Sequence, residues 1–378
     1  MTPAALAMQI KEAGRRLGFD RVAVGPAGPP EHAAAFESWL DAGHAGTMGY
    51  LERGRDKRVD PERVLPGARS VVACALGYYQ GRGAEGPPGI ARYAWGEDYH
   101  GVIEPRLGSL ADLIASLEPG AESRGYVDTG PVLERDLAAR AGLGWIGKNT
   151  MLLHPDLGSF FFIGTVLTTA ELEPDAPLPD RCGSCTRCLD ACPTGAFAAP
   201  YVLDARRCVS YLTIEHRGPI SAELRPGVGA WTFGCDECQT VCPWNGRAPV
   251  TREPAFAARR HTPATELLAL DEAEYRETFR GSPLKRARRE GLARNAAIAL
   301  GNHGTAGDVP ALTRALGHVE PAVRGHAAWA LGRIGGEGAR AALRVARSRE
   351  GDAGAGEEME RALAQLSPRE TTEGRMHR

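Results

Sequence analysis

The chain has 378 residues, a length typical of two or three domains. Hydrophobic residues make up 43% of it and charged residues 24%, an ordinary globular composition that excludes collagen-like and wholly disordered proteins. The formal net charge of -2 excludes a uniformly basic nucleic-acid coat but permits a local basic face.

The N-terminal stretch, MTPAALAMQIKEAGRR, has neither the basic start nor the apolar core and cleavage site of a signal peptide. The best apolar stretches, at 70–79 and 160–169, are strand-sized and well short of the ~18 residues of a membrane helix. We therefore expect a cytoplasmic protein without membrane contact.

Residues 1–175 have the pattern of a mixed α/β domain. A helix is expected first, because Thr2 can cap it and Pro3 suits its first turn. The further expected elements are strands at 22–24, 70–78 and 160–169, a helix at 132–141, and a Gly- and Pro-rich loop at 81–89. Neither a P-loop nor a G-x-G-x-x-G after a strand occurs, so a nucleotide cofactor has no support.

Eight of the nine cysteines fall between positions 182 and 242. Cytoplasmic thiols stay reduced, so this clustering indicates metal binding or catalysis. The first run, C-x2-C-x2-C-x3-C-P, is the bacterial ferredoxin pattern, whose fourth thiolate reaches a second [4Fe-4S] cluster. The second run lacks one cysteine, which Cys208 can replace. We assign Cys182, Cys185, Cys188 and Cys242 to one cluster, and Cys192, Cys208, Cys235 and Cys238 to the other.

Two alternatives accompany this assignment. Eight thiolates could instead form two all-cysteine zinc sites, although zinc ribbons usually place two C-x2-C pairs far apart. The ninth cysteine, Cys74, lies in the apolar stretch SVVACAL and is expected to be a small core residue.

The C-terminal part contains an internal repeat. The stretch AAIALG at 296–301 recurs as AAWALG at 327–332, a period that predicts stacked helical hairpins of the HEAT type. We expect an α+β multidomain protein: an α/β domain at 1–175, a ferredoxin-like domain at 176–250, helical repeats at 251–366 and a disordered tail at 367–378.

Charge is distributed unevenly among these parts. Residues 252–349 carry 17 basic and 10 acidic side chains, whereas 1–251 carry 24 basic and 30 acidic ones. A basic run is usually a solvated helix face. On a repeat module, however, clustered arginines also suit phosphates. The densest run comprises Lys285, Arg286, Arg288, Arg289 and Arg294.

Together these features resemble the epoxyqueuosine reductase family of tRNA-modifying enzymes, over essentially residues 1–365. The cysteine runs alone are shared by many ferredoxin-like proteins, so further stretches make the likeness specific. They are DKRVDP at 56–61, YAWGEDYH at 93–100, VDTG at 127–130 and GLGWIGKN at 142–149.

The resemblance implies a cofactor and a reaction that composition does not reveal. Family members bind cobalamin in the N-terminal domain, receive electrons through the clusters from an external donor, and reduce the epoxide of epoxyqueuosine to queuosine at the wobble position of tRNA. The D-x-H-x-x-G motif that gives cobalt a histidine in many B12 proteins is absent, which is compatible because this family does not rely on it.

By the same resemblance, Asp128 is the expected proton donor and contacts the cofactor. Its alternative role is to accept hydrogen bonds from the helix start near Gly130. The other expected cobalamin contacts are Arg58, Asp98, Lys148 and Ser210. Arg58 and Lys148 could equally form surface ion pairs, and Asp98, with Tyr99 and His100, could be a polar turn.

The resemblance also assigns tRNA binding to the repeat module of a monomeric protein. The expected RNA contacts are Lys285, Arg286, Arg288, Arg289, Arg294 and Arg324, with His216 between the cysteine runs. Three rivals remain: a reductive dehalogenase-like enzyme acting on a small molecule, a non-catalytic ferredoxin-type electron carrier, and a zinc-stabilised RNA-binding adaptor.

Overall fold

The computed structural model describes residues 1–84, 86–260 and 262–366. They form two compact units: unit 1 comprises 1–216, 234–261 and 279–286, and unit 2 comprises 217–233, 262–278 and the chain from 287 onward. Instead of separating at 175 and 250, the cysteine-rich segment folds with the N-terminal part. The predicted tail at 367–378 lies outside the described residues.

A four-stranded sheet in the order β1-β2-β6-β3 forms the centre of unit 1. All three strand pairs are antiparallel, with Cys74 of β2 opposite Val22 of β1 and Gly164 of β6. The strands are β1 (Arg21–Pro26), β2 (Ser70–Gly77), β3 (Ser123–Tyr126) and β6 (Phe161–Thr168). The three apolar strands confirm the predictions, whereas the short polar strand β3 was not predicted because its sequence, SRGY, has no apolar alternation.

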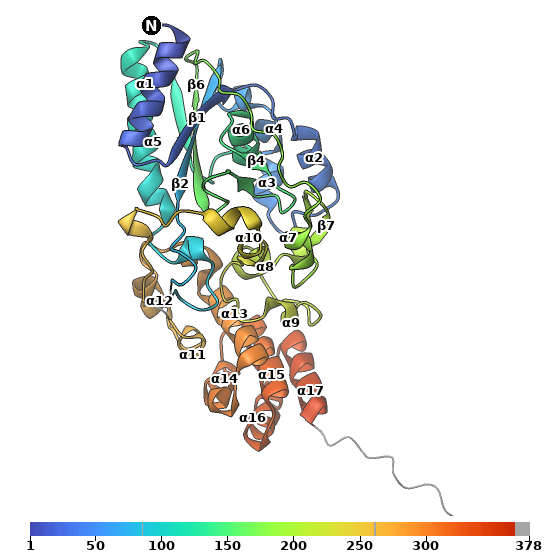
Figure 1. Cartoon of the computed structure of the whole chain (residues 1–378). Coiled ribbons are helices and arrows are strands. Elements are labelled where there is room, and N and C mark those ends of the chain that lie inside the picture. The colour runs from blue at the N-terminus through green and yellow to red at the C-terminus, as the bar shows by residue number, and fades with distance from the viewer. Residues whose placement is uncertain (85, 261, 367–378) are drawn as a thin grey trace, which may run out of the picture. The chain divides into compact units, whose positions relative to one another are not determined.

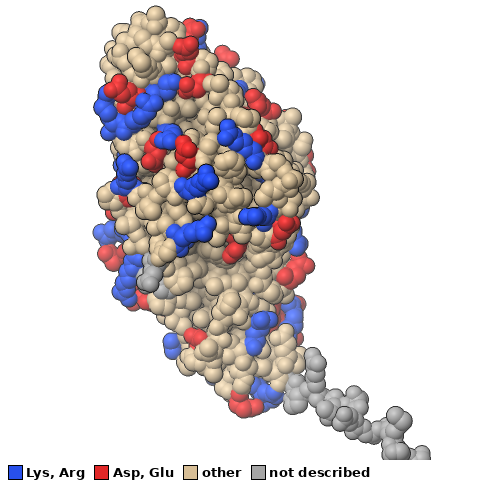
Figure 2. Space-filling model, viewed as in Figure 1, with Lys and Arg blue, Asp and Glu red and all other residues tan. Residues whose placement is uncertain are grey.

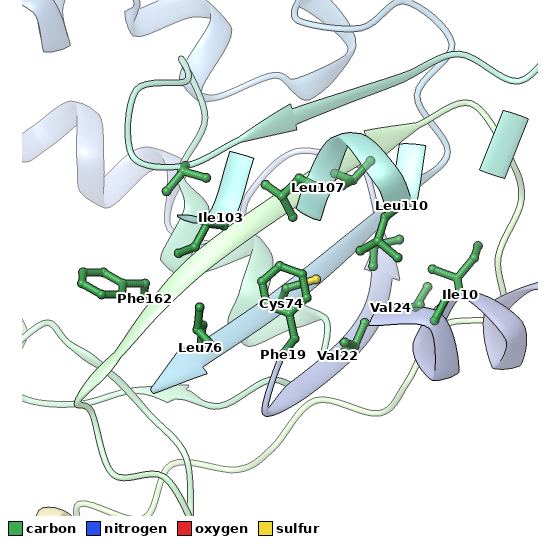
Figure 3. Close-up of a cluster of buried hydrophobic side chains, with 14 of the residues drawn as sticks. Ile10, Phe19, Val22, Val24, Cys74, Leu76, Ile103, Leu107, Leu110 and Phe162 are labelled. Carbon is green, nitrogen blue, oxygen red and sulfur yellow. The ribbon is translucent and has the colours of Figure 1, made fainter. Parts of the chain in front are cut away.

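Helices cover both faces of this sheet (Figure 1). Helices α1 (Pro3–Arg16) and α5 (Tyr99–Leu117) pack on one face, and α6 (Glu134–Arg140) packs on the other. Alternation along the strands explains the division, since side chains at i and i+2 share a face. On β2, Cys74 points toward α1 and α5, among the apolar side chains in Figure 3, while Ala73 and Ala75 face α6.

Cys74 is fully buried, which confirms its prediction as a core residue. Burial raises the pKa of its thiol, so the group is an inert apolar contact at neutral pH.

Smaller elements complete unit 1. They are α2 (Ala33–Asp41), α3 (Gly49–Arg53), α4 (Arg55–Arg58), β4 (Trp145–Ile146), β5 (Leu152–Leu153), α7 (Arg187–Asp190), β7 (Phe197–Ala199), β8 (Val202–Leu203), α8 (Val209–Ile214) and α10 (Glu237–Thr240). Long-range hydrogen bonds join the cysteine segment to the α/β part. The indole of Trp39 donates to the Leu203 carbonyl at 2.6 Å, and the Ala205 amide donates to the His44 carbonyl at 2.9 Å.

Unit 2 is helical. Its elements are α9 (Arg225–Val228), α11 (Ala264–Leu267), α12 (Glu272–Thr278), α13 (Arg288–His303), α14 (Val309–Ala315), α15 (Pro321–Ile334), α16 (Glu337–Arg347) and α17 (Ala353–Leu366). The two repeat stretches lie in α13 and α15, which confirms the predicted hairpins. Their small residues allow close packing: a Cβ on Gly301 would lie 2.3 Å from the Trp329 ring.

Candidate functional site

Asp128 lies in a strained turn directly after strand β3. Its φ of 61° is in the left-handed region, which is uncommon for a residue other than glycine. The Thr129 amide donates to the Val127 carbonyl oxygen at 2.6 Å and so closes a γ-turn around Asp128. Such a backbone persists only where surrounding contacts hold it. The turn leaves Asp128 exposed.

The first of these contacts comes from Tyr99 at the start of α5. Its hydroxyl donates to Oδ2 of Asp128 at 2.8 Å. The Tyr99 ring is fixed between two others, stacked at 4.3 Å on Phe162 and at 4.2 Å on His100. Burial, and then the charge of Asp128, raises the pKa of Tyr99 well above its usual range. The phenol therefore keeps its proton and remains a donor to the carboxylate.

The second contact comes from Glu134 in the first turn of α6. The Asp128 amide donates to both carboxyl oxygens of Glu134, at 2.9 and 3.0 Å. Burial, and then the neighbouring Asp128 charge, raises the pKa of Glu134 to about 8. The alternative in which the Asp128 side chain caps the following helix is therefore wrong: its side chain bonds Tyr99, and the helix supplies an acceptor to its backbone.

Arg58 holds the chain that follows this turn. Its Nη1 donates to the carbonyl oxygens of Gly130 at 3.2 Å and Val132 at 3.3 Å. These bonds replace the surface ion pair considered for it. Its buried Nε has no hydrogen-bond partner among the described residues.

Asp98 is the N-cap of helix α5. Its Oδ1 accepts from the His100 amide at 3.1 Å and lies 2.7 Å from His100 Nδ1. The hydrogen bond with His100 lowers the pKa of Asp98. This capping role is the polar-turn alternative, and the cobalamin contact of Asp98 stays a prediction. The buried Nε2 of His100 has no partner within the described chain.

Unpartnered buried donors are costly, so a polar ligand beside the Asp128 turn would satisfy them. Arg58 Nε is such a donor. His100 Nε2 is a second buried polar atom without a partner, and with Nδ1 donating to Asp98 it accepts in the neutral ring and donates in the charged one. The charge of Asp128 acts on both side chains. Cobalamin carries many amide groups, which both donate and accept, and a phosphate, which accepts. The residues present therefore fit such a cofactor.

Tyr50, Glu215 and Arg286 form a further polar cluster in unit 1. The Arg286 guanidinium donates to both carboxyl oxygens of Glu215, at 2.7 and 3.0 Å, and lies 5.5 Å from the Tyr50 ring centroid. Tyr50 is 37% exposed. Burial of its hydroxyl, followed by Glu215, raises the pKa of Tyr50, and Asp128 contributes to the same shift.

The cysteines associate electrostatically in the two predicted sets. Cys242 acts on Cys188, and Cys182 and Cys185 act on Cys242. In the other set, Cys208 acts on Cys235, and Cys192, Cys208 and Cys235 act on Cys238. Cys188 also acts on Cys238, so the sets are neighbours. These contacts support the predicted division of ligands.

No three His, Cys, Asp or Glu side chains within the described ranges are arranged to share one metal ion. In a [4Fe-4S] cluster, the four thiolates bind at separate irons of one cluster and need not converge on a single ion. Burial raises the pKa of Cys235 to about 12 and also raises that of Cys238 well above its usual range. Only a strongly positive group such as iron would stabilise these thiolates.

Lys148 contacts the cysteine-rich segment. Its Nζ donates to the carbonyl oxygens of Gly183 at 2.6 Å and Cys185 at 3.1 Å, at the first two cysteines. These bonds shape the cysteine loop, and the cobalamin contact of Lys148 stays a prediction. Ser210 lies next to Cys208, where its backbone N–H interacts with that thiol.

Some of the predicted RNA-binding side chains are exposed, and others are bonded to residues of this chain. Lys285 and Arg288 are exposed. Arg289 is partly buried, with Nη1 3.0 Å from His318 Nε2. His216 is partly exposed and packs against Tyr211.

Two of the predicted RNA contacts are engaged in bonds within unit 2. Arg294 is 2% exposed and donates to the Gly218 carbonyl at 2.8 Å. Arg324 forms a two-point ion pair with the buried Glu350, at 2.6 and 2.7 Å. Each guanidinium satisfies a buried acceptor, and a phosphate contact for either one stays a prediction.

On the face drawn in Figure 2, basic and acidic side chains are interspersed across the described residues that it shows.

Neither Glu134 nor Tyr50 was predicted from the sequence. The stretch D-T-G-P-V-L-E places a glutamate six residues after Asp128 at a helix start, a signal that could have indicated Glu134. Tyr50 had no such signal.

Eight clustered cysteines, in one compact unit with an α/β sheet and a carboxyl held in a strained turn, define an iron-sulfur oxidoreductase. Three family models match: epoxyqueuosine reductase QueG at 58–129, a 4Fe-4S double cluster binding domain at 181–245, and HEAT repeats at 283–364. The last confirms the repeat prediction.

Relatives of known name agree. Epoxyqueuosine reductase of Pseudomonas aeruginosa is 44% identical over 351 residues, covering 88% of this chain and 96% of the relative. That of Escherichia coli K12 is 39% identical over 307 residues, covering 79% and 81%. The chain therefore belongs to the epoxyqueuosine reductase family, whose members use two [4Fe-4S] clusters and cobalamin.

Solved structures show the same fold. A crystal structure of epoxyqueuosine reductase with an epoxyqueuosine-modified tRNA-Tyr stem loop has a TM-score of 0.89 and 34% identity, covering 97% of this chain and 100% of that one. A structure from Bacillus subtilis, with its catalytic aspartate loop swung out of the active site, has a TM-score of 0.89 and 33% identity, with the same coverage. Among the described residues, no helix of unit 1 or unit 2 is long and apolar enough to cross a membrane.

Proposed function

We propose that this protein reduces the epoxide of epoxyqueuosine in tRNA to the alkene of queuosine, with Asp128 as the proton donor. One observation carries the residue assignment: an exposed carboxyl is fixed in a strained turn by Tyr99, in the same compact unit as the eight clustered cysteines. Membership of the epoxyqueuosine reductase family supports the reaction.

The chemistry requires a proton at the oxygen of the epoxide. As the C–O bond opens, alkoxide charge develops on that oxygen, and a positioned acid lowers the barrier. Bound cobalamin supplies the reduction at the epoxide carbon, with electrons that enter from an external donor through the two clusters. Overall, two electrons and two protons convert the epoxide to an alkene and one water.

In this assignment the chain's own residues position the acid. The Tyr99 hydroxyl holds Oδ2 of Asp128 at 2.8 Å, which leaves the other carboxyl oxygen for the substrate. Arg58 Nε is proposed to donate to an acceptor group of cobalamin, His100 Nε2 to meet one of its amides, and Ser210 to lie beside the cofactor near Cys208.

The RNA side of the site is proposed to begin at Tyr50. Single-stranded bases stack on aromatic rings and arginine planes, and splayed bases of an anticodon loop are of this kind. Tyr50 and Arg286 offer such a surface, and the exposed Lys285 and Arg288 would meet phosphates. His216, which lies in the same unit as Tyr50, is also proposed to contact the RNA.

The turn that carries Asp128 is proposed to move during turnover. In the Bacillus subtilis relative, the catalytic aspartate loop has been seen swung out of the active site of that protein. A flipped nucleoside needs space to enter, and a strained turn is easily displaced.

Electrons are proposed to enter at the cluster held by Cys182, Cys185, Cys188 and Cys242. All eight cysteines of the two sets are partly exposed. Burial nevertheless raises the pKa of Cys238 well above its usual range, which makes its set the more desolvated one. We further propose that the protein acts as a monomer in the cytoplasm, where its tRNA substrate occurs; size-exclusion chromatography with light scattering tests the first point.

The function is tested by nucleoside analysis of epoxyqueuosine-containing tRNA after anaerobic incubation with cobalamin and a reductant. We expect queuosine to appear at the expense of the epoxide, and an unchanged epoxide overturns the assignment. Stoichiometric cobalamin binding separates the enzyme from a ferredoxin-type carrier. A dehalogenase-like reaction is disfavoured by the family, and a colourless, zinc-loaded protein would restore the adaptor alternative.

A further inference from the structure

The Asp128 turn needs an acceptor for its central amide. Within a γ-turn the hydrogen bond runs from Thr129 to Val127, so the Asp128 N–H is not used by the turn itself. The positive φ at this residue is unfavourable, and its cost must be offset by contacts from outside the turn. The Asp128 amide, free within the turn, is a group through which such a contact can act.

Glu134 supplies this acceptor from a firmly packed helix. Leu137 and Ala138, on the same helix α6, are 1% and 0% exposed in the core of unit 1. Asp136 fastens the helix to a second loop by accepting from the Glu31 and His32 amides at 3.0 and 2.9 Å. The carboxyl of Glu134 therefore accepts from the Asp128 amide while its own backbone is held in place by the packing of helix α6.

We propose that Glu134 is a positioning residue, which holds Asp128 in its reactive turn by accepting the Asp128 amide. The proposal rests on the proposed function, in which Asp128 is the acid, and gives a role to a side chain that this function does not otherwise use. Glu134 touches neither substrate nor cofactor in it.

The charged groups around Glu134 indicate which property matters. Asp128 on the turn opposes its ionisation, while Arg135 on α6 and Arg58 on α4 favour it. Burial is the largest influence and favours the protonated form at neutral pH. A protonated carboxyl still has a carbonyl oxygen that accepts from an amide. The length of the side chain, rather than its charge, therefore decides whether the contact forms.

Three variants separate length from charge. Glu134→Gln keeps both the length and an acceptor oxygen, Glu134→Asp keeps the acid but shortens the reach by one methylene, and Glu134→Ala removes the acceptor. We expect the Asp and Ala variants to lose about 10²-fold in kcat, because a catalytic group displaced by about 1 Å loses that much. We expect the Gln variant to recover most of the rate, and KM for tRNA to change little in all three.

The direct readout is hydrogen exchange at the Asp128 amide, measured by mass spectrometry on cluster-loaded protein without tRNA. Exchange is expected to accelerate at least tenfold in the Asp and Ala variants, with wild-type protection in the Gln variant. Asp136→Asn is the matched control, since it weakens another amide contact of α6. It should loosen residues 31–32 and leave the Asp128 amide unchanged.

Unchanged exchange at Asp128 in the Asp and Ala variants overturns the proposal, whatever their activity. A Gln variant as slow as the Ala variant also overturns it, because charge or proton transfer would then be the property in use. If wild-type protein does not reduce the epoxide, but exchange at the Asp128 amide still accelerates in the Asp and Ala variants and not in the Gln variant, the proposed function fails and the positioning contact stands. If the Ala variant does not fold, the Asp and Gln pair decides alone.

Discussion

At the scale of the single residue, the proposed acid, Asp128, is defined by its neighbours more than by its own type. Many aspartates follow strands, but Asp128 combines an exposed side chain, a positive φ and a hydrogen bond from a buried phenol. The ring of Tyr99 is held by stacking on Phe162. The position of one carboxyl thus depends on a strand, two helices and their packing.

The assignment of Asp128 predicts the behaviour of Asp128→Asn. Asparagine preserves the shape and can still interact with the Tyr99 hydroxyl, but it has no acidic proton. We expect kcat for epoxide reduction to fall by about 10²–10⁴, the usual contribution of a general acid. Cobalamin and tRNA affinities should stay within about threefold. The check is single-turnover nucleoside analysis with binding titrations, and wild-type speed would remove Asp128 from the mechanism.

Glu134 predicts a pH-dependent stability. Its pKa is about 8 in the folded protein against an ordinary value of 4.5, so the folded state holds a proton that the unfolded chain has released between these values. Folding is therefore destabilised progressively as pH rises from about 4.5 to about 8. Glu134→Gln cannot titrate, so its melting temperature should exceed that of wild type by a margin that grows from pH 5 to pH 8. A constant margin contradicts the raised pKa.

At the scale of the element, the two repeat helices are matched by small residues. A Cβ at Gly301 of α13 would lie 2.3 Å from the Trp329 ring and 3.1 Å from Ala330 Cα. At Gly325 of α15 the nearest atom is Glu358 Cγ at 3.5 Å, an ordinary contact. The repeat AxALG is thus a packing requirement, which is why its period could be detected in the sequence.

These two glycines predict opposite effects of the same change. Gly301→Ala should destabilise the protein by about 1–3 kcal/mol through overpacking. Gly325→Ala should be neutral or stabilising by up to about 1 kcal/mol, because alanine favours helix where space allows. Thermal unfolding at matched iron content compares them, and equal effects of the two changes would contradict the close approach of α13 and α15.

At the scale of the whole molecule, the cysteines connect two stretches far apart in sequence. Cys242, from the second run, acts on Cys188 of the first, while Cys208 acts on Cys235. Each proposed cluster therefore closes a loop of the chain and stabilises the fold of the cysteine segment itself.

This crossed arrangement predicts the iron content of two alanine variants. Cys208→Ala should lose the cluster that includes Cys192, which lowers bound iron from about eight to about four atoms per chain. Cys74→Ala, in the sheet core, should retain the full content and change only stability. Iron analysis and electron paramagnetic resonance after anaerobic purification make the comparison; full iron in the Cys208 variant would show that this cysteine is not a ligand.

Exposed and buried basic residues are expected to have different effects, the exposed ones on tRNA binding and the buried one on the stability of the fold. Lys285→Ala and Arg288→Ala should each weaken tRNA binding and reduce the salt dependence of log Kd by about one unit, since each would remove a phosphate contact. Arg294→Ala should instead lower the melting temperature, because its guanidinium holds the Gly218 carbonyl. Fluorescence anisotropy at several salt concentrations tests this, and an unchanged slope for both exposed residues would contradict phosphate contact.

The sequence by itself determined the features that repeat or alternate. The apolar strands β2 and β6, the buried Cys74, the two cysteine runs and the helical repeat all follow from spacing, because burial and metal binding impose short, regular patterns. The near-zero net charge was correctly resolved into a weakly acidic N-terminal part and a basic C-terminal part.

Only the tertiary structure decided which individual charged groups are available. Arg294 and Lys148 stand in basic or motif-rich stretches, yet each satisfies backbone carbonyls from a distant segment. Glu134 gained its role through a turn that no sequence pattern describes. Long charged side chains bond the acceptors that folding brings near, and a buried acceptor left without a donor costs the most free energy. For this physical reason a basic run in the sequence does not by itself establish an RNA-binding surface.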